Sequence, residues 1–280
     1  MPTETVRFAA HDGARIGYSV EGQGPPVVLL HAVGLDRTIW GDYRGYLARD
    51  RTVVCVDLPG HGESDPINDG ITLARMADAV VSVLRAEALD IVDLVGISMG
   101  GMIAQIVALE HPELVRSLVL CSTASTFVAS VRAAIRARGD AAMDDGMPAV
   151  TVGTIERWFS PEGRSADAAL RCGGLLANDD PAVFGECWYA IAELETAPRL
   201  PELRVPALVI TGDADISLPA DASAVLAARI LGSESVVVPG GWHLGALETP
   251  GPYRHAIVSF LGRVLSSGHP STSPGVRFLG

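Results

Sequence analysis

The sequence Gly96-Ile97-Ser98-Met99-Gly100 places a serine midway between two glycines. A serine hydroxyl is a weak nucleophile at neutral pH, so it needs a neighbouring base and an acid that orients the base. The pattern Gly-X-Ser-X-Gly is typical of a serine on a sharp turn between a strand and a helix. Ser98 is therefore the candidate nucleophile. The alternative is a serine that caps a helix in a glycine-rich turn.

The candidate base is His243, one of seven histidines in the chain. It lies in the segment PGGWHL, which follows the last expected strand and precedes the terminal helix. A loop at the carboxyl edge of a parallel sheet is where such a base is needed. The alternative is a histidine exposed by chance in a tolerant loop of small residues.

The orienting acid is expected between the serine and the histidine along the chain. Asp213 and Asp215 both follow the expected strand at 207–211 directly. We favour Asp215 as the acid and give Asp213 a structural role in the turn. Glu248 is a weaker candidate, which we expect to cap a helix or support the histidine loop.

A serine nucleophile also needs two backbone donors for the oxyanion that develops at the attacked carbonyl. We expect one from the N–H of Met99, which follows the nucleophile at a helix N-terminus. The loop His31-Ala32-Val33-Gly34 follows another expected strand, and we assign the second donor to Val33. A plain loop turn is the alternative for this segment, and it is compatible with that role.

The elements that must position these residues alternate between short β-branched runs and helical patterns. Helices cover both faces of a parallel sheet, so its strands are almost continuously apolar, as in TVVCVD at 52–57. The expected strands are 15–21, 27–31, 52–57, 91–96, 117–121, 207–211 and 235–238, and the expected helices are 72–88, 102–110, 221–230 and 252–265. The prediction is an α/β fold with a mostly parallel sheet and helices on both faces.

Residues 125–200 lack the strand signal and read as helices broken by glycine and proline. We therefore predict a helical cap, 125–200, inserted into a core made of 1–124 and 201–265. Residues 266–280, SSGHPSTSPGVRFLG, have the composition of a linker and are expected to form a flexible tail without chemistry.

Composition excludes several kinds of chemistry. All 21 basic residues are arginine, so neither a Schiff-base lysine nor a Walker-A lysine is available. A net charge of −12 opposes binding to nucleic acid.

The chain has no HxH, HExxH or paired-cysteine motif, and we expect neither a metal nor another cofactor. Without a basic leader or a long apolar run, we expect a cytoplasmic protein that acts on a small molecule without a membrane partner, possibly as a homo-oligomer.

Five segments in this order, HAVG, DLPGHGES, GISMGG, VPALVITGDAD and GGWHLGALETP, resemble the α/β-hydrolase superfamily across residues 15–265. Three others, GISMGGMIAQIVALEHPELVRSLVLCSTAS, ERWFSPE and RVPALVITGDADISLPAD, resemble 3-oxoadipate enol-lactonases. The resemblance implies an α/β-hydrolase fold, a Ser98–Asp215–His243 triad and hydrolysis of a small acidic enol-lactone in aromatic catabolism. The chain departs from the family at Ala32, where many members have glycine.

The substrate pocket is expected between the sheet edge and the cap. Candidate contacts are Trp40, Trp158 and Trp188, although each tryptophan can equally be core. A substrate carboxylate could be held by an arginine of the cap, and the candidates are Arg132, Arg136 and Arg138. The alternative is that these arginines are solvated.

The sequence favours a serine hydrolase that cleaves a small ester or lactone through an acyl-enzyme. It leaves open a carbon–carbon bond hydrolase, a cofactor-free haloperoxidase or perhydrolase, and a small-molecule receptor on the same scaffold.

Overall fold

The computed structural model describes residues 5–218, 220–267 and 276–278, which build one mixed sheet flanked by helices. The first two strands in the sheet order pair antiparallel with their neighbours, and every later pair is parallel. In sheet order the strands are β1 (Val6–His11), β2 (Ala14–Glu21), β4 (Thr52–Val56), β3 (Pro26–Leu30), β5 (Val92–Ile97), β6 (Val115–Cys121), β7 (Ala207–Gly212), β8 (Glu234–Val238) and β9 (Val276–Phe278). The predicted mostly parallel α/β sheet is confirmed.

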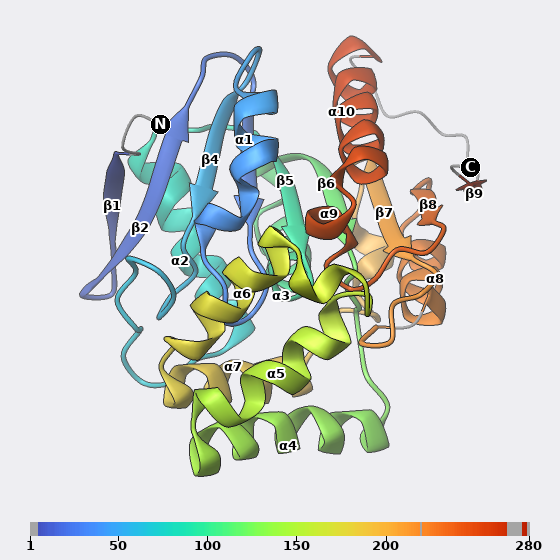
Figure 1. Ribbon diagram of the computed structural model, residues 1–280. Helices are drawn as coiled ribbons and strands as arrows, with labels where there is room; N and C mark the ends of the chain where they lie inside the picture. The colour runs from blue at the N-terminus through green and yellow to red at the C-terminus, as the bar shows by residue number, and fades with distance from the viewer. Residues whose placement is uncertain (1–4, 219, 268–275, 279–280) are drawn as a thin grey trace.

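Helices cover both faces of this sheet (Figure 1). One face is covered by α1 (Gly41–Leu47) and α10 (Pro250–Ser267), and the other by α2 (Leu73–Ala86), α3 (Met99–Glu110) and α8 (Ala220–Arg229). The shorter helices are η1 (Arg37–Trp40), η2 (Pro112–Leu114), η3 (Gly163–Ser165), η4 (Leu200–Glu202) and α9 (Gly245–Glu248). None of the helices in the described ranges is long and apolar enough to cross a membrane.

The edge strand β1 and the start of α3 differ from the sequence prediction. β1 was not predicted, because this edge strand buries only Ala9 and therefore lacks a clear apolar pattern. α3 begins at Met99, three residues before the predicted start at 102, because the strand passes through Ser98 directly into the helix. The segment Met99-Gly100-Gly101 carries no helical pattern, since glycine is a poor helix former.

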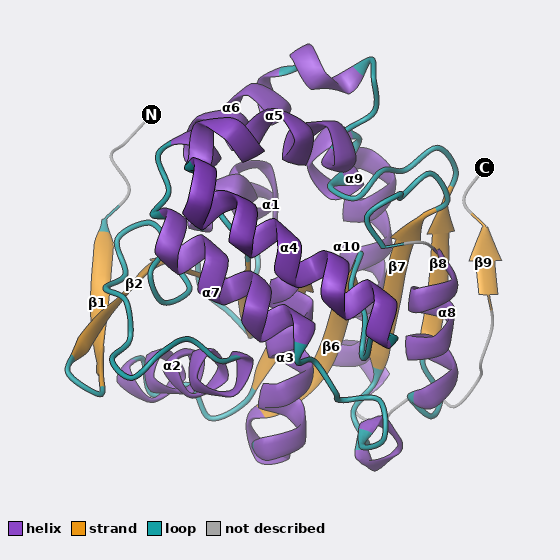
Figure 2. Ribbon diagram, turned by 90° about the horizontal axis from the view of Figure 1, so that it is seen from below, coloured by secondary structure: helices purple, strands orange, loops and turns teal. Residues whose placement is uncertain are grey.

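Between β6 and β7 the chain forms four α-helices: α4 (Ala129–Asp145), α5 (Met147–Trp158), α6 (Asp167–Ala177) and α7 (Pro181–Ala192). We call these helices the α4–α7 layer. They lie across the carboxyl ends of the strands (Figures 1 and 2). α4 and α7 approach closely at two glycines, since a Cβ on Gly139 would lie 2.8 Å from the carbonyl oxygen of Gly185.

Of the tail expected at 266–280, residues 266 and 267 are the last of α10, and 276–278 pair with β8 as β9. The other residues of that tail lie outside the described ranges.

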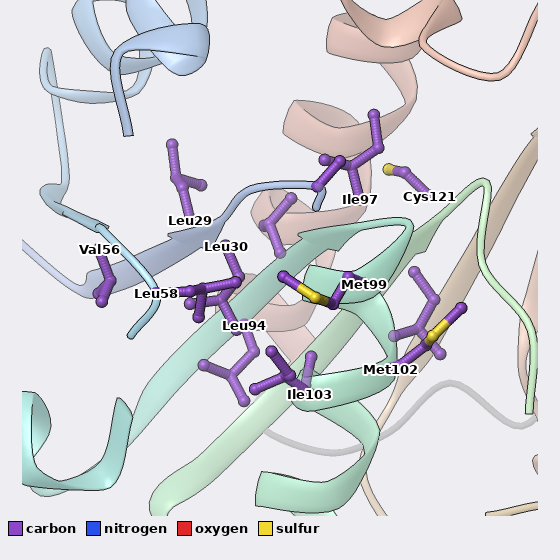
Figure 3. Packing of buried hydrophobic residues seen from close by; sticks show 14 of the residues in the cluster. Leu29, Leu30, Val56, Leu58, Leu94, Ile97, Met99, Met102, Ile103 and Cys121 are labelled. Carbon is purple, nitrogen blue, oxygen red and sulfur yellow. The ribbon is translucent and has the colours of Figure 1, made fainter. Parts of the chain in front are cut away.

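Beneath the carboxyl edge, side chains of β3, β5 and the first turn of α3 pack into one apolar cluster (Figure 3). Leu30, Ile97, Met99 and Met102 are at most 2% exposed. Burying each such side chain contributes about 1.5–3 kcal/mol to folding. This packing fixes the end of β5 relative to the start of α3, where Ser98 lies.

At the opposite end of β5, the buried carboxylate of Asp93 holds a network of hydrogen bonds. It accepts from Arg51 Nη1 at 2.7 Å, from Arg116 Nη2 at 2.7 Å and from Ser117 Oγ at 2.6 Å. The side chains of Asp93 and Arg51 are 0% and 5% exposed. A buried charge of this kind is tolerable only with its partners in place.

We predict that Asp93→Ala lowers the free energy of unfolding by about 3–5 kcal/mol, because it leaves a buried guanidinium without its counter-charge. Urea titration of the variant and the parent measures the difference. Asp65→Ala is the matched control, because it removes an exposed aspartate–arginine pair. Equal losses in the two variants would show that the Asp93 network does not stabilise the sheet.

Candidate active site

The turn between β5 and α3 is sterically crowded, and this crowding sets the conformation of Ser98. A Cβ on Gly96 would lie 2.3 Å from the carbonyl oxygen of Gly100, and a Cβ on Gly100 would lie 2.3 Å from that of Leu30. Ser98 has φ 54° and ψ −117°, outside the regions that a serine normally adopts. Its amide donates to the carbonyl of Cys121 at 2.9 Å, and this bond holds the turn against β6. Strain of this kind is often found at functional sites.

His243 lies between Ser98 and Asp215. The three residues belong to three separate loops, which follow β5, β7 and β8. Its Nδ1 is 2.9 Å from Asp215 Oδ2, and its Nε2 is 3.0 Å from Ser98 Oγ. A carboxylate can only accept, so Nδ1 carries the proton and Nε2 accepts from the serine hydroxyl. The three residues are 3–7% exposed. The structure thus brings the three predicted residues together in the order that activates a serine nucleophile.

Two aspartates after β7 have different partners. Asp215 Oδ1 accepts from the amides of Ser217 and Leu218, each at 2.8 Å, which leaves Oδ2 for His243. Asp213 Oδ1 instead accepts from the amide of Gly240 at 2.6 Å and ties the loop after β7 to the loop after β8.

Glu248, the other candidate acid, bonds to the amide and hydroxyl of Ser160 and does not contact the histidine. It therefore joins α9 to the end of α5.

The two predicted oxyanion donors lie on neighbouring segments beside the serine. Met99 is the first residue of α3, and Val33 follows β3 in the adjacent loop. In the described part of the chain, neither amide donates to a protein acceptor. Both N–H groups are thus available to a developing negative charge.

The loop that carries Val33 is fixed by two buried histidines, whose importance the sequence analysis missed. His31 Nδ1 donates to the carbonyl of Ala32 at 2.8 Å, and its Nε2 accepts from the amide of Leu58 at 2.9 Å. His61 Nδ1 donates to the carbonyl of Pro59 at 3.0 Å, and its Nε2 accepts from the amide of Gly34 at 3.1 Å. In each ring one nitrogen donates and the other accepts. Burial lowers the pKa of His31 well below its usual value.

A cavity of about 480 Å³ opens above Ser98 and His243 beneath the α4–α7 layer. Its walls are mostly apolar and include Arg138 and two of the candidate contact residues, Trp158 and Trp188. The Trp158 ring lies 6.2 Å from the His243 ring, measured between centroids. The backbone carbonyl of Trp158 accepts from the amide of Leu244, so the end of α5 also holds the loop that carries His243.

The structure places two other predicted contacts outside this cavity lining. Trp40 is fully buried and packs edge-on against Tyr43 at 5.5 Å between ring centroids. Arg132 points to the junction of α4 and α7, where its guanidinium donates to the carbonyls of Phe127, Ala192 and Leu194. The same guanidinium bonds to Glu195 Oε2 at 2.8 Å. These partners hold Arg132 at the junction of α4 and α7, outside the lining of the cavity.

No group of three or more histidine, cysteine, aspartate or glutamate side chains within the described residues is arranged to hold a metal ion.

The sheet order, the sharp turn at Ser98 and the helices on both faces together describe a known family. Residues 27–256 match the alpha/beta hydrolase family. The chain belongs to this family, because the match covers most of its length.

Similar proteins include curated enzymes and a solved structure. An (E)-2-((N-methylformamido)methylene)succinate hydrolase of Acinetobacter baylyi is 26% identical, over 93% of this chain and 98% of that protein. A 3-oxoadipate enol-lactonase 2 of the same species is 25% identical, over 89% of this chain and 93% of that protein. A solved hydrolase from Pseudomonas aeruginosa superposes with a TM-score of 0.87 at 27% identity, covering 92% of this chain and 98% of that one. The predicted resemblance to enol-lactonases is confirmed.

We predict that the buried neutral His31 makes stability fall as pH drops below about 6.5. Because the folded-state pKa is lowered, the unfolded chain takes up a proton that the folded chain does not, so unfolding is favoured at lower pH. Urea titrations at pH 7.5 and 5.5 measure the loss. His31→Gln keeps an acceptor but cannot titrate, and it should lose less stability over the same range. An equal loss in both proteins would contradict this role for His31.

Proposed function

We propose that this chain is a serine hydrolase that cleaves a small carboxylic ester or lactone through an acyl-enzyme. The observation that carries the proposal is the position of His243, within hydrogen-bond distance of both Ser98 Oγ and Asp215 Oδ2. The family and its hydrolase relatives support this class of reaction. An intact, buried set of these three side chains favours an enzyme over a receptor.

In the proposed reaction, Ser98 Oγ attacks the substrate carbonyl while His243 Nε2 takes the hydroxyl proton. Asp215 stabilises the imidazolium that forms and keeps the ring in position. The amides of Met99 and Val33 donate to the oxyanion of the tetrahedral intermediate. The intermediate collapses, and His243 gives its proton to the departing alkoxide. Water then attacks the acyl-enzyme with the same histidine as base, which releases the acid and restores Ser98.

We further propose that residues 125–200 act as a cap that excludes water from the reacting carbonyl. The cavity of about 480 Å³ beneath the α4–α7 layer has the size of a small-molecule site. Its tryptophan walls lower the local dielectric, which strengthens the hydrogen bonds to the oxyanion.

A panel of p-nitrophenyl esters, lactones and vinylogous diketones tests the reaction type, because the fold alone does not define the substrate. The proposed hydrolase releases nitrophenol in a burst that matches the enzyme concentration when deacylation is slow. Turnover of the diketones alone would instead favour carbon–carbon bond hydrolysis.

We predict that Ser98→Ala lowers kcat/KM on esters by about 10³-fold or more, because it removes the nucleophile. His243→Ala should lose a similar amount, and the double variant little more, since the two residues act as one unit. Circular dichroism checks that each variant is folded. If Ser98→Ala kept more than about a tenth of the parental activity, Ser98 would not be the nucleophile.

The two aspartates after β7 should differ in their effect on activity. Asp215→Asn would offer its amide to Nδ1 and reverse the imidazole tautomer, an effect of about 10⁴-fold in kcat in a related triad. Asp213→Asn removes only the negative charge of a group that bonds to the amide of Gly240. We expect kcat within about threefold of the parent for Asp213→Asn. The reverse ranking would assign the orienting role to Asp213.

A further inference from the structure

Arginines between β6 and β7 differ in whether they pair with a carboxylate. Arg132, Arg136 and Arg164 each pair with a glutamate. Among the described residues, Arg138, Arg157 and Arg171 form no ion pair with an acidic side chain, although the nearby charge of Glu156 favours the charged form of Arg157. Of these three, only Arg138 and Arg157 line cavities at or next to the candidate active site. Arg138 lines the cavity of the candidate active site, and both arginines line a second cavity next to it.

Arg138 lines the same cavity as Ser98 and His243. Its guanidinium carbon lies 4.9 Å from the centre of the Trp188 ring, which fixes the cation against the cavity wall. The neighbouring residue Gly139 brings this part of α4 close to Trp188. A Cβ on Gly139 would lie 3.3 Å from the Cβ of Trp188.

Arg157 lies close to Arg138 across an adjoining cavity of about 290 Å³, which both side chains line. Its Nη2 donates to Thr154 Oγ1 at 3.0 Å, and its Nε is buried without an acceptor in the described part of the chain. Burial, together with the charge of Arg157, lowers the pKa of Arg138 to about 10, so Arg138 stays charged at neutral pH. Two partly buried cations this close to each other are costly without an anion between them.

The opposite end of the cavity is apolar and open. Val128, Val131 and Ile216 belong to the lining and are 67%, 41% and 59% exposed. On α4, Val131 and Arg138 are seven residues apart, which is about 10 Å along the helix axis. The cavity therefore has an exposed apolar mouth at one end of this stretch of α4 and the Arg138 guanidinium at the other, with Arg157 in the adjoining cavity.

We propose that Arg138, supported by Arg157, binds a free carboxylate on the acyl part of the substrate. The inference rests on the proposed hydrolase function and specifies its substrate as a half-ester of a short dicarboxylic acid. The alcohol departs first and needs the open mouth, whereas the acyl part stays on Ser98 with its carboxylate at the arginines. A planar guanidinium suits a carboxylate because it can donate two parallel hydrogen bonds. The chain carries a net charge of −12, so attraction of an anion has to come from local cations.

Matched ester pairs test this subsite. The probes are p-nitrophenyl monoesters of dicarboxylic acids with five to eight carbons, each paired with the monocarboxylic ester of equal length. At one length the parent should prefer the anionic ester by about tenfold or more in kcat/KM, and Arg138→Met should abolish that preference through KM. Arg157→Met should weaken it. Arg136→Met is the matched control, because Arg136 lies on the same helix but pairs with Glu193 outside the cavity.

Thermal unfolding separates recognition from a structural role. Removing an unpaired buried cation should leave the Tm of Arg138→Met unchanged or raise it, whereas a structural arginine would lower it. Equal losses on the charged and neutral esters, or a parent without preference, would overturn the carboxylate subsite. If neutral esters were still cleaved in a Ser98-dependent manner, the proposed hydrolase function would stand. If the parent and Ser98→Ala released nitrophenol from neither ester faster than buffer, the hydrolase proposal itself would fail.

Discussion

The close backbone packing between β5 and α3 is the constraint on which the rest of the site depends. Leu30, Gly96 and Gly100 approach so closely that a single added methyl group would collide with a carbonyl oxygen. The chain can turn so sharply only because Gly96 and Gly100 carry no side chain, and the turn forces Ser98 to a positive φ. The surrounding apolar cluster and the bond to Cys121 over-determine this conformation. The same contact places the strand that leads to Val33 directly beside the helix that begins at Met99.

The other site residues reach this turn through loops at the carboxyl edge of the sheet. β7 and β8 are neighbours, so the loops that follow them carry Asp215 and His243 to the same place. A Cβ on Gly212 would lie 1.9 Å from the carbonyl oxygen of Gly241, which means that these two loops touch. Asp213 closes this contact with its bond to Gly240. The acid and the base are therefore positioned by backbone contacts, and their side chains remain available for chemistry.

Much of the sheet could be predicted, because buried parallel strands have an almost continuous apolar pattern and the Gly-X-Ser-X-Gly turn marks where one of them ends. The edge strand β1 could not, because one buried residue gives no pattern. The order of Asp215 and His243 along the chain indicated which loops would meet. The roles of His31 and His61 were hidden, because each contacts an amide 27 residues away and no local pattern encodes such a pairing.

The arginines of α4 show most clearly what a single helix cannot reveal. Arg132, Arg136 and Arg138 lie within two turns of one helix, and their own sequence does not distinguish a substrate contact from a structural bond. The contacts with the end of the partner helix α7 make the distinction. Arg132 binds the carbonyl of Ala192 and the side chain of Glu195, and Arg136 binds the side chain of Glu193. Arg138 lies over Trp188 instead, where α7 offers an aromatic face and no acid. Its charge therefore has no acidic partner among the described side chains of the cavity. This unpaired charge is the reason we propose an anion-selective site and not a purely apolar pocket.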